Sequence, residues 1–236
     1  MHPYERIAEH YRQQIRDGVL SPREKLPTVK ELAEEHNVAT ATVRNAMGWL
    51  KTEGYISISH RGTFVAEHPP GGAAPRDRLA RVLRTGSLFA TGETARVTAA
   101  ELVVPPLYVS ELFDLDPGDQ VIRREYVTGR GSQRLMLAVD WYPAQFAAVP
   151  DILSTAPGKA DQVLSQIEEH TGRRATSGRD AAHSRAADER EANLLGLPPH
   201  SMILAGAHEW SDNQGLITYG EWCLPPRFTI GYEYEV

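Results

Sequence analysis

The sequence predicts an α+β protein made of two unlike parts. Residues 1–67 hold three segments with the apolar spacing of helices, followed by two short alternating segments typical of strands. Residues 79–236 mix helical patterns with strand-like segments that hairpin-type turns connect. Residues 68–78 contain prolines and glycines with little apolar content, which indicates an exposed linker. We therefore expect a small helical domain with a two-stranded ribbon, a linker, and a domain built on an antiparallel sheet.

Composition is that of a soluble globular protein. Of the 236 residues, 41% are hydrophobic and 24% are charged. No apolar run approaches the roughly 18 residues needed to cross a bilayer, and the charged N-terminus lacks the apolar core of a signal peptide. Cys223 is the single cysteine, so an intramolecular disulfide is impossible. These features predict a cytoplasmic location and no membrane partner.

The net charge of −6 is unevenly distributed. Residues 1–67 contain nine Lys/Arg and nine Asp/Glu, so the whole excess of acidic residues falls in residues 68–236. A neutral segment can still present a basic surface, because contact with phosphate depends on local charge. The charge balance therefore does not exclude nucleic acid as a partner.

The first helix and its end follow from apolar spacing. Tyr4, Ile7, Ala8, Tyr11 and Ile15 recur on one helical face. Gly18 follows the last of them and is a plausible terminator. The prolines of the next segment keep it from being helical.

Two more helices and a ribbon follow closely. Thr28 and Glu31 form a capping box ahead of a short helix over 29–36, which Asn37 breaks. A third helix places Val43, Ala46, Met47 and Leu50 inward and stops at Gly54. Strands are expected over 55–59 and 63–67, joined by a tight turn at His60-Arg61-Gly62.

This order of elements is typical of a winged helix-turn-helix. The third helix begins with small residues, which lets its first turn approach a DNA groove. Thr40, Thr42 and free backbone N–H groups can bind phosphate there. Arg44 can present two donors to guanine, and Asn45 faces outward beside it. The alternative is a purely structural subdomain in which Thr40 is an ordinary helix cap.

Residues 18–65 resemble the DNA-binding domain of the GntR family of bacterial transcription regulators. The shared residues are Leu26-Pro27, Leu32-Ala33, Val38, Thr42-Val43-Arg44, Ala46, Leu50, Glu53-Gly54, Gly62-Thr63 and Val65. The resemblance places Thr28, Lys30, Thr42, Arg44 and Gly62 at the DNA. The full candidate set for DNA binding is Thr28, Lys30, Thr40, Thr42, Arg44, Asn45, Arg61 and Gly62.

Four positions depart from the family pattern. Ala39 replaces a serine, and Thr40 replaces an arginine that would add a base or phosphate contact. His60 stands at a wing glycine, and Arg23 replaces a turn glycine. We therefore expect a different operator sequence and an altered turn at Arg23.

The second part predicts an antiparallel sheet with helices. Strands are expected over 95–104, 120–128, 134–142, 173–184, 202–212, 216–224 and 228–236. Helices are expected over 108–115, 160–172 and 188–197. Turns over 129–133 and 212–215 would connect hairpins.

This part resembles the UTRA effector-binding domain of the HutC subfamily, whose fold is similar to chorismate lyase. The resemblance rests on "VIRREYVT", "DWYPAQF", "REANLLGL" and Tyr-x-Glu. It implies effector-binding residues at Arg124, Tyr126, Asp140, Tyr219 and Glu221. Tyr126 stands where the family has arginine and Asp140 where it has serine. Because a phosphate site needs cations and hydroxyl donors, we hypothesise an effector that is not strongly anionic.

Arg124 and Asp140 also have a purely structural interpretation. A loop centred on Gly131 would place Ala138 opposite Arg124, with Asp140 diagonal to it on the same face. The two charges could then form a cross-strand ion pair. The three tryptophans of this part are expected in the core or in a pocket wall: Trp141, Trp210 and Trp222.

Other chemistry finds no support in the sequence. The nine histidines form no metal-ligand spacing, and the nucleophile elbow of hydrolases and the glycine-rich phosphate loops are absent. We therefore predict no catalytic residue, no metal and no cofactor. The chain is expected to be a homodimeric regulator, most simply a repressor, that binds a roughly palindromic double-stranded DNA site and a small-molecule effector. The alternatives are an enzyme of lyase-like fold and a DNA-binding regulator without an effector.

Overall fold

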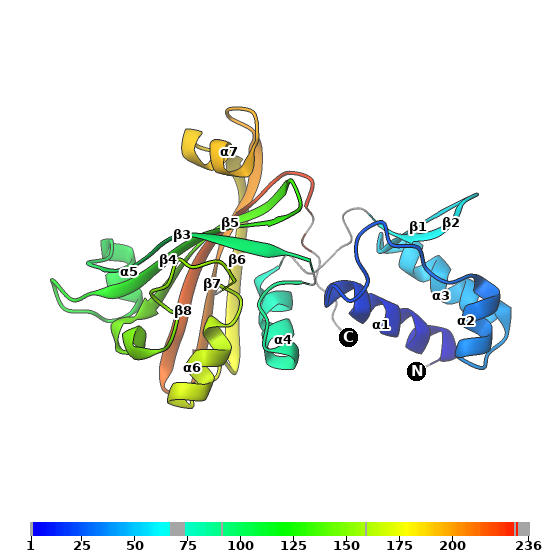
Figure 1. The fold of residues 1–236 in the computed structure, drawn as a ribbon, viewed down its shortest axis with the longest axis horizontal. Helices are drawn as coiled ribbons and strands as arrows, with labels where there is room; N and C mark the ends of the chain where they lie inside the picture. Colours follow the sequence, from blue (N-terminus) through cyan, green and yellow to red (C-terminus); the bar gives the residue numbers. More distant parts are fainter. Residues whose placement is uncertain (1, 67–73, 91, 159, 229, 231–236) are drawn as a thin grey trace. The chain divides into compact units, whose positions relative to one another are not determined.

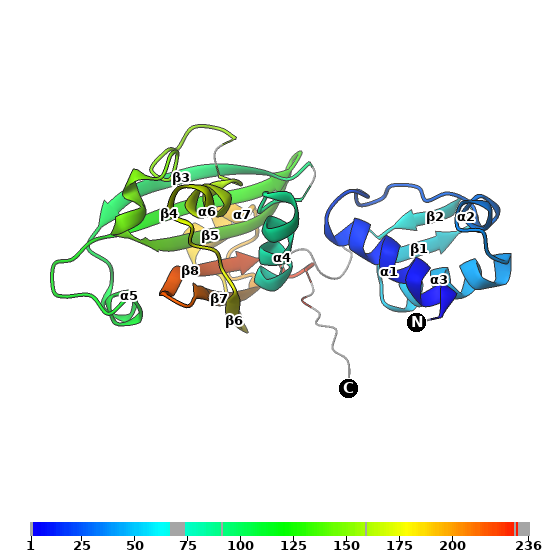
Figure 2. The ribbon, with the colours of Figure 1, turned by 90° about the horizontal axis from the view of Figure 1, so that it is seen from below.

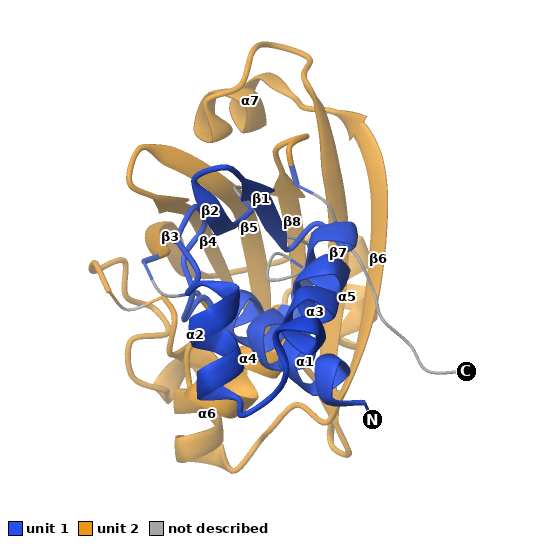
Figure 3. Cartoon of the chain, turned by 90° about the vertical axis from the view of Figure 1, so that its right-hand side faces the viewer, with its two compact units in different colours: residues 1–77, 90–92, 228–236 blue, residues 78–89, 93–227 orange. Residues whose placement is uncertain are grey.

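The computed structural model describes residues 2–66, 74–90, 92–158, 160–228 and 230. The chain divides into two compact units, drawn in blue and orange in Figure 3. The first comprises residues 1–77, 90–92 and 228–236, and the second comprises residues 78–89 and 93–227. Each unit has its own buried apolar cluster.

The first unit contains three helices and a two-stranded ribbon (Figure 1). Its elements are α1 (Pro3–Arg16), α2 (Val29–Glu35), α3 (Thr40–Thr52), β1 (Ile56–Ser59) and β2 (Gly62–Val65). These confirm the predicted elements to within two residues at most boundaries. The ribbon pairs Ser59 with Gly62, so its turn consists of two residues, His60 and Arg61.

Local sequence explains where these helices begin. Thr28 caps α2 with its hydroxyl, which accepts from Glu31 N–H, and Glu31 bonds back to the Thr28 N–H. Helix α3 has Ala39 at its cap position and no side-chain hydrogen bond there. Its first N–H groups therefore have no side-chain acceptor from the cap.

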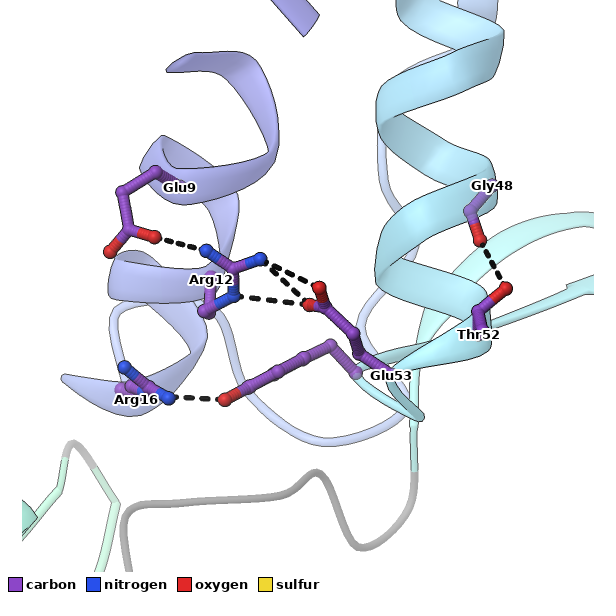
Figure 4. A network of polar contacts seen from close by, with 7 residues as sticks. Glu9, Arg12, Arg16, Gly48, Thr52 and Glu53 are labelled. Carbon is purple, nitrogen blue, oxygen red and sulfur yellow. Dashed lines mark hydrogen bonds and ion pairs between the residues drawn. The ribbon is translucent and has the colours of Figure 1, made fainter. Parts of the chain in front are cut away.

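One apolar core and one ion pair hold the unit together. The buried residues are Ile7, Ala8, Tyr11, Ile15, Leu26, Leu32, Ala33, Val43, Ala46, Met47, Leu50, Tyr55, Ile56 and Val65. Arg12 of α1 is 7% exposed, and its guanidinium forms an ion pair at 2.8 Å with Glu53, the residue after α3 (Figure 4). It also contacts Glu9 within α1. The pair fixes the end of α3 to α1.

The second unit is a six-stranded antiparallel sheet in the order β3-β4-β5-β8-β7-β6. The strands are β3 (Thr94–Val103), β4 (Val121–Arg130), β5 (Gln133–Pro143), β6 (Ser177–Ala186), β7 (Met202–Asp212) and β8 (Gly215–Leu224). The helices are α5 (Leu107–Leu112), α6 (Val163–Thr171) and α7 (Glu189–Leu195), with a 3-10 helix, η1, over Ala144–Ala148. This architecture confirms the predicted α+β class. The strand expected over 228–236 falls largely outside the described residues.

Helix α4 (Pro75–Thr85) was not predicted. It begins inside the segment expected to be a linker, of which 67–73 lie outside the described residues. Proline is well suited to a first helical position, and Leu79, Val82 and Leu83 supply the apolar spacing of a helix. Ala74 and Arg78 are buried, so residues 74–78 are not exposed linker.

The sheet has two faces, because side chains alternate along each strand. One carries Arg124, Tyr126 and Asp140, and we call it the Asp140 face. Helices α4 and α6 lie on this face (Figure 2). The other carries Trp141, Tyr219 and Glu221, and we call it the Glu221 face; α5 and α7 pack on it.

The predicted register of the β4–β5 hairpin was wrong by two residues. Arg124 lies directly opposite Asp140, and Ala138 lies opposite Tyr126. The turn is tighter than expected, since Arg130 pairs with Gln133, and a bulge after Thr128 shifts the register once more. A bulge of this kind leaves no simple signal in the alternation of one strand.

Candidate functional site

The outer surface of α3 has the form expected for a groove-binding helix. Thr40, Ala41, Arg44, Asn45 and Gly48 are exposed, and Thr42 is half-buried. The opposite side of the helix is the predicted core-facing set. Small side chains and free N–H groups at the start of α3 make a slim tip of positive potential.

Two predicted DNA contacts lie at the start of α2, Thr28 and Lys30, and both already have a partner within the chain. The Thr28 hydroxyl already accepts the Glu31 N–H at 3.3 Å, so only its proton is available to an anion. Lys30 is exposed and lies 3.9 Å from Glu34. A surface pair of this kind is weak and leaves the ammonium group accessible to phosphate.

The ribbon presents a further cation that the sequence did not single out. Lys25 forms a bridge with Phe64, which adds its segment to the edge of the ribbon. A side chain at Gly62, whose φ is 127°, would lie 3.1 Å from Lys25 Cε and 3.9 Å from its Nζ. Lys25 therefore lies over the base of the turn that carries Arg61. The sequence signal for this contact was the position of Lys25 in an extended segment, next to Leu26 and between Pro22 and Pro27.

Arg23 adopts a backbone conformation that glycine favours. Its φ is 66°, in the left-handed region, and its N–H donates to the Val65 carbonyl oxygen. An arginine in this conformation strains the backbone locally.

The sheet separates the five predicted effector residues. Arg124, Tyr126 and Asp140 lie on the Asp140 face and are at most 3% exposed. Tyr219 and Glu221 lie on the Glu221 face, since they pair with Trp141 and Val139 while Gly220 pairs with Asp140. The fold therefore does not place all five residues in a single pocket.

Arg124 anchors a turn against the sheet. Its Nη1 donates to the carbonyl oxygens of Asp151, Ile152 and Ser154, at 3.1, 2.6 and 3.0 Å. Its positive charge also lowers the pKa of Asp140 across the strand pair, against the larger effect of burial. These contacts give Arg124 a positioning role.

Asp140 is the centre of a buried polar cluster. Its Oδ2 accepts the hydroxyls of Tyr126, at 2.9 Å, and Tyr142, at 3.3 Å. Its Oδ1 lies 3.9 Å from Nε2 of His208, which stacks on Trp210. Burial raises the pKa of Asp140 to about 6. Burial, reinforced by the charge of Arg78, lowers the pKa of His208 to about 3, so this imidazole is neutral near pH 7.

Gly220 makes room for this cluster. A Cβ at position 220 would lie 2.1 Å from His208 Cε1 and 2.5 Å from Asp140 Oδ1. The two side chains from the neighbouring strands therefore meet over the bare backbone of β8.

Several buried polar atoms near this face lack a hydrogen-bond partner within the described part of the chain. They are Oδ1 of Asp140, both ring nitrogens of His208, Oγ1 of Thr128, Nε and Nη1 of Arg78, and Nε1 of Trp210 and Trp222. Burying such groups without a partner costs about 1–3 kcal/mol each. Their concentration in one region is typical of a site for a polar ligand.

A cavity of about 520 Å³ lies next to the cluster. Phe89 lines it, and its ring meets the Tyr126 ring edge to face with 5.7 Å between the ring centroids. Glu93 also lines it and pairs at 2.9 Å with Arg78. Phe89 and Glu93 thus connect the cavity to the Asp140 face, although Asp140 and His208 do not themselves line it. We take the cavity and the neighbouring cluster as the candidate ligand site.

Glu221 belongs to a different cluster. Its Oε2 accepts the Tyr108 hydroxyl at 3.0 Å and Nε1 of Trp141 at 3.2 Å. The Tyr108 ring meets Tyr219 edge to face. Burial and the charge of Glu221 raise the pKa of Tyr219 to about 12. These contacts tie α5 to the sheet.

The described residues contain no group of three metal-ligating side chains. Among the helices that the structure describes, none is long and apolar enough to cross a membrane.

Two family models match the chain. Residues 3–65 match the bacterial regulatory proteins of the gntR family, and residues 92–226 match the UTRA domain. The HTH-type transcriptional regulator YurK of Bacillus subtilis is 30% identical over 132 residues, which are 55% of this chain and 53% of that protein. The chain thus spans about half the length of this relative. The repressor NagR of the same organism is 38% identical over 65 residues, 27% of each chain.

A solved structure shows the same fold over nearly the whole chain. It is PhnF from Mycobacterium smegmatis, with a TM-score of 0.57 and 21% identity, and the match covers 94% of this chain and 96% of that one. YurK is described as a transcriptional regulator and NagR as a transcriptional repressor. The lyase-like alternative is therefore not supported.

Proposed function

Because the chain belongs to the GntR family of bacterial regulatory proteins and carries a UTRA domain, we propose that it is a cytoplasmic repressor that binds double-stranded DNA as a homodimer and releases it on binding a small-molecule effector. The observation that supports DNA binding most directly is the slim, uncapped start of α3 with Arg44 exposed on its outer surface. Two such helices, one per copy, would occupy successive major grooves of a roughly palindromic site.

The proposed contacts at DNA divide by chemistry. Arg44 and Asn45 lie on the outer surface of α3 and are assigned to base edges. Thr40 and Thr42 in the first turn of α3, and Thr28 and Lys30 at the start of α2, are assigned to phosphate oxygens. Arg61 and Gly62 of the ribbon, with Lys25 beside them, are assigned to the neighbouring backbone of the DNA.

The effector is proposed to be polar without strong negative charge. Asp140 supplies a buried anion and acceptor, and Tyr126 supplies a hydroxyl where the family has a cation. The polar atoms near the Asp140 face offer donors and acceptors to a ligand with several hydroxyl, amide or amine groups. Arg124 and Asp140 thus support the site by position, whereas Tyr219 and Glu221 lie outside it.

Each of the two parts of the chain is proposed to bind a different ligand. Residues 1–67 bind DNA, the segment between them and α4 connects, and residues 79–236 bind effector and dimerise. Effector binding would change the distance between the two DNA-binding parts and so lower DNA affinity.

Selection of bound duplexes from a random pool tests DNA binding. The expected product is a palindromic consensus with half-sites about one helical turn apart. Failure to enrich any sequence at low salt would contradict the proposal.

A metabolite screen for release of the selected duplex tests the effector. Neutral polar compounds are expected to release it, with calorimetric binding to the free protein. Tight binding of a sugar phosphate would refute the proposed effector class. Regulation without any releasing ligand would favour the effector-independent alternative.

A further inference from the structure

Helix α3 contains a glycine in its interior, at position 48. Gly48 is exposed and has helical backbone angles, so an alanine would adopt the same conformation without strain. A Cβ added there would have open space, since no atom outside the helix's own backbone lies within 4 Å of it. Glycine destabilises a helix relative to alanine, because it loses more backbone freedom on folding. Gly48 therefore makes the free protein less stable without any benefit to its packing.

The other glycines that the structure describes each have a reason within the fold. Most adopt a positive φ, which strains residues that have a Cβ. At the remaining positions an added Cβ would lie 3.1 Å or less from a neighbouring atom: Gly129, Gly178, Gly206 and Gly220. Among the described glycines, Gly48 alone has neither a positive φ nor a close neighbour. We therefore look for its reason in a contact with another molecule.

Gly48 lies beside the two residues that are assigned to base edges. Residues three and four apart are neighbours on a helix surface, so Gly48 adjoins both Asn45 and Arg44. Helical side chains lean toward the N-terminus, so a side chain at position 48 would cover the turn that carries these two residues. The Gly48 carbonyl oxygen accepts the hydroxyl of Thr52 at 3.0 Å (Figure 4). What position 48 presents outward is therefore a bare Cα.

We propose that Gly48 is a specificity-determining residue of the DNA interface: the edge of a base pair approaches the bare backbone there, beside the base that Arg44 contacts. This rests on the proposed DNA binding and adds a steric requirement to it. The major groove is about 12 Å wide and a helix with its side chains is about 10–12 Å across, so a single methyl group affects how deeply the helix enters. Glycine is the residue that permits such a close approach of the backbone.

The first test uses Gly48→Ala, which should change stability and DNA binding in opposite directions. In the free protein, hydrogen exchange at the buried α3 residues Val43 and Leu50 should slow by about two- to fivefold, because alanine favours the helix. Affinity for the duplex selected by the unaltered protein should fall by about tenfold, because the methyl group meets a base edge. Fluorescence anisotropy measures this affinity. An unchanged or higher affinity would overturn the proposal, since a purely structural glycine predicts that result.

The second test locates the contact on the DNA. The loss in Gly48→Ala should depend on the base pair next to the one read by Arg44, and a random duplex at low salt should bind as before, because non-specific binding uses the phosphates. Lys51→Ala, three residues further along α3, is the control and should change affinity for every duplex by the same factor. An equal loss on every duplex for Gly48→Ala would overturn the base contact alone. Failure of the unaltered protein to select any duplex would overturn the proposed DNA binding as well.

Discussion

At the scale of single residues, the candidate functional side chains lie next to residues whose own side chains are unusually small. Ala39, Thr40 and Ala41 keep the start of α3 slim, so Arg44 one turn later can extend beyond it. On the sheet, Gly220 allows Asp140 and His208 to meet. In both places, a small neighbouring residue leaves space for the functional side chain: Arg44 on α3, and Asp140 and His208 on the sheet.

Arg44→Ala tests whether Arg44 contacts a base of the operator. Loss of a bidentate contact to guanine should cost about 1–3 kcal/mol in binding and relax preference at one operator position. Fluorescence anisotropy with the selected duplex and its single-base variants measures both. Lys51→Ala, an exposed cation in the last turn of the same helix, is the control and should leave base preference unchanged. A loss that is uniform across sequences would make Arg44 a phosphate contact.

Asp140→Asn tests the burial of the carboxylate. The folded pKa of about 6 lies above the ordinary value of 3.8, so ionisation of Asp140 opposes folding and its contribution worsens as pH rises from about 4 to 6. The amide should therefore be more stable than the wild type at pH 7.5, by about 1–3 kcal/mol, and not at pH 4. Urea unfolding followed by tryptophan fluorescence measures this difference. An equal effect at both pH values would show that folding does not raise the pKa of this carboxyl group.

At the scale of elements, the first unit depends on how α1, α3 and the ribbon are joined. The Arg12–Glu53 pair joins α1 to the end of α3, and the Lys25 bridge joins the segment before α2 to the ribbon (Figure 4 shows the former). These two contacts set where the recognition surface and the turn of the ribbon lie within the unit.

Arg12→Met should destabilise the first unit by about 2–4 kcal/mol, because it leaves the Glu53 carboxylate partly buried without its partner. Thermal unfolding followed by circular dichroism measures the loss. Adding Glu53→Leu should recover much of it, since no unpaired charge then remains. If the double variant is less stable than Arg12→Met, the pair is not the source of the loss.

Lys25→Gln tests the ribbon contact. If its ammonium neutralises one phosphate per copy, the slope of log K against log[salt] should fall by about 1 per contact, with base preference unchanged. Titrations at several salt concentrations give the slope. Glu24→Gln, which adjoins it without carrying a cation, is the matched control and should not lower the slope. An unchanged slope for Lys25→Gln would remove Lys25 from the interface.

The sequence predicted features that depend on contacts between residues near one another in the chain. It did not predict those that depend on contacts between distant segments. The helices of the first unit were predicted because capping at Thr28 and apolar spacing are local. The placement of Arg124 opposite Asp140 was not, because a bulge after Thr128 sets it. Nor did the sequence show that Tyr219 and Glu221 lie on the other face from Asp140, since only the pairing of β5 with β8 reveals this. Helix α4 was missed because its proline and its charged residues resemble those of a linker.

At the scale of the whole molecule, the proposed function links DNA and effector through one equilibrium. If effector binding lowers DNA affinity, DNA must lower effector affinity by the same factor, because both ligands act on the same states of the protein. The two parts of the chain that bind these ligands are separate units with separate cores.

This linkage is measurable with the released duplex and the effector found by screening. Calorimetry of effector binding with and without saturating operator should give a ratio equal to that of the operator affinities with and without effector, typically about 5–150-fold. A random duplex is the control and should give a ratio near one at the same salt. Unequal ratios would mean that a further ligand or assembly state takes part.

The bare backbone at Gly220 also limits how this protein can diversify. Any residue with a Cβ there would strike His208 and Asp140, so recognition of a new ligand cannot arise from that central position. Variation must instead enter at the surrounding side chains, such as Tyr126 and Thr128. A library for altered ligand response should therefore leave position 220 unvaried.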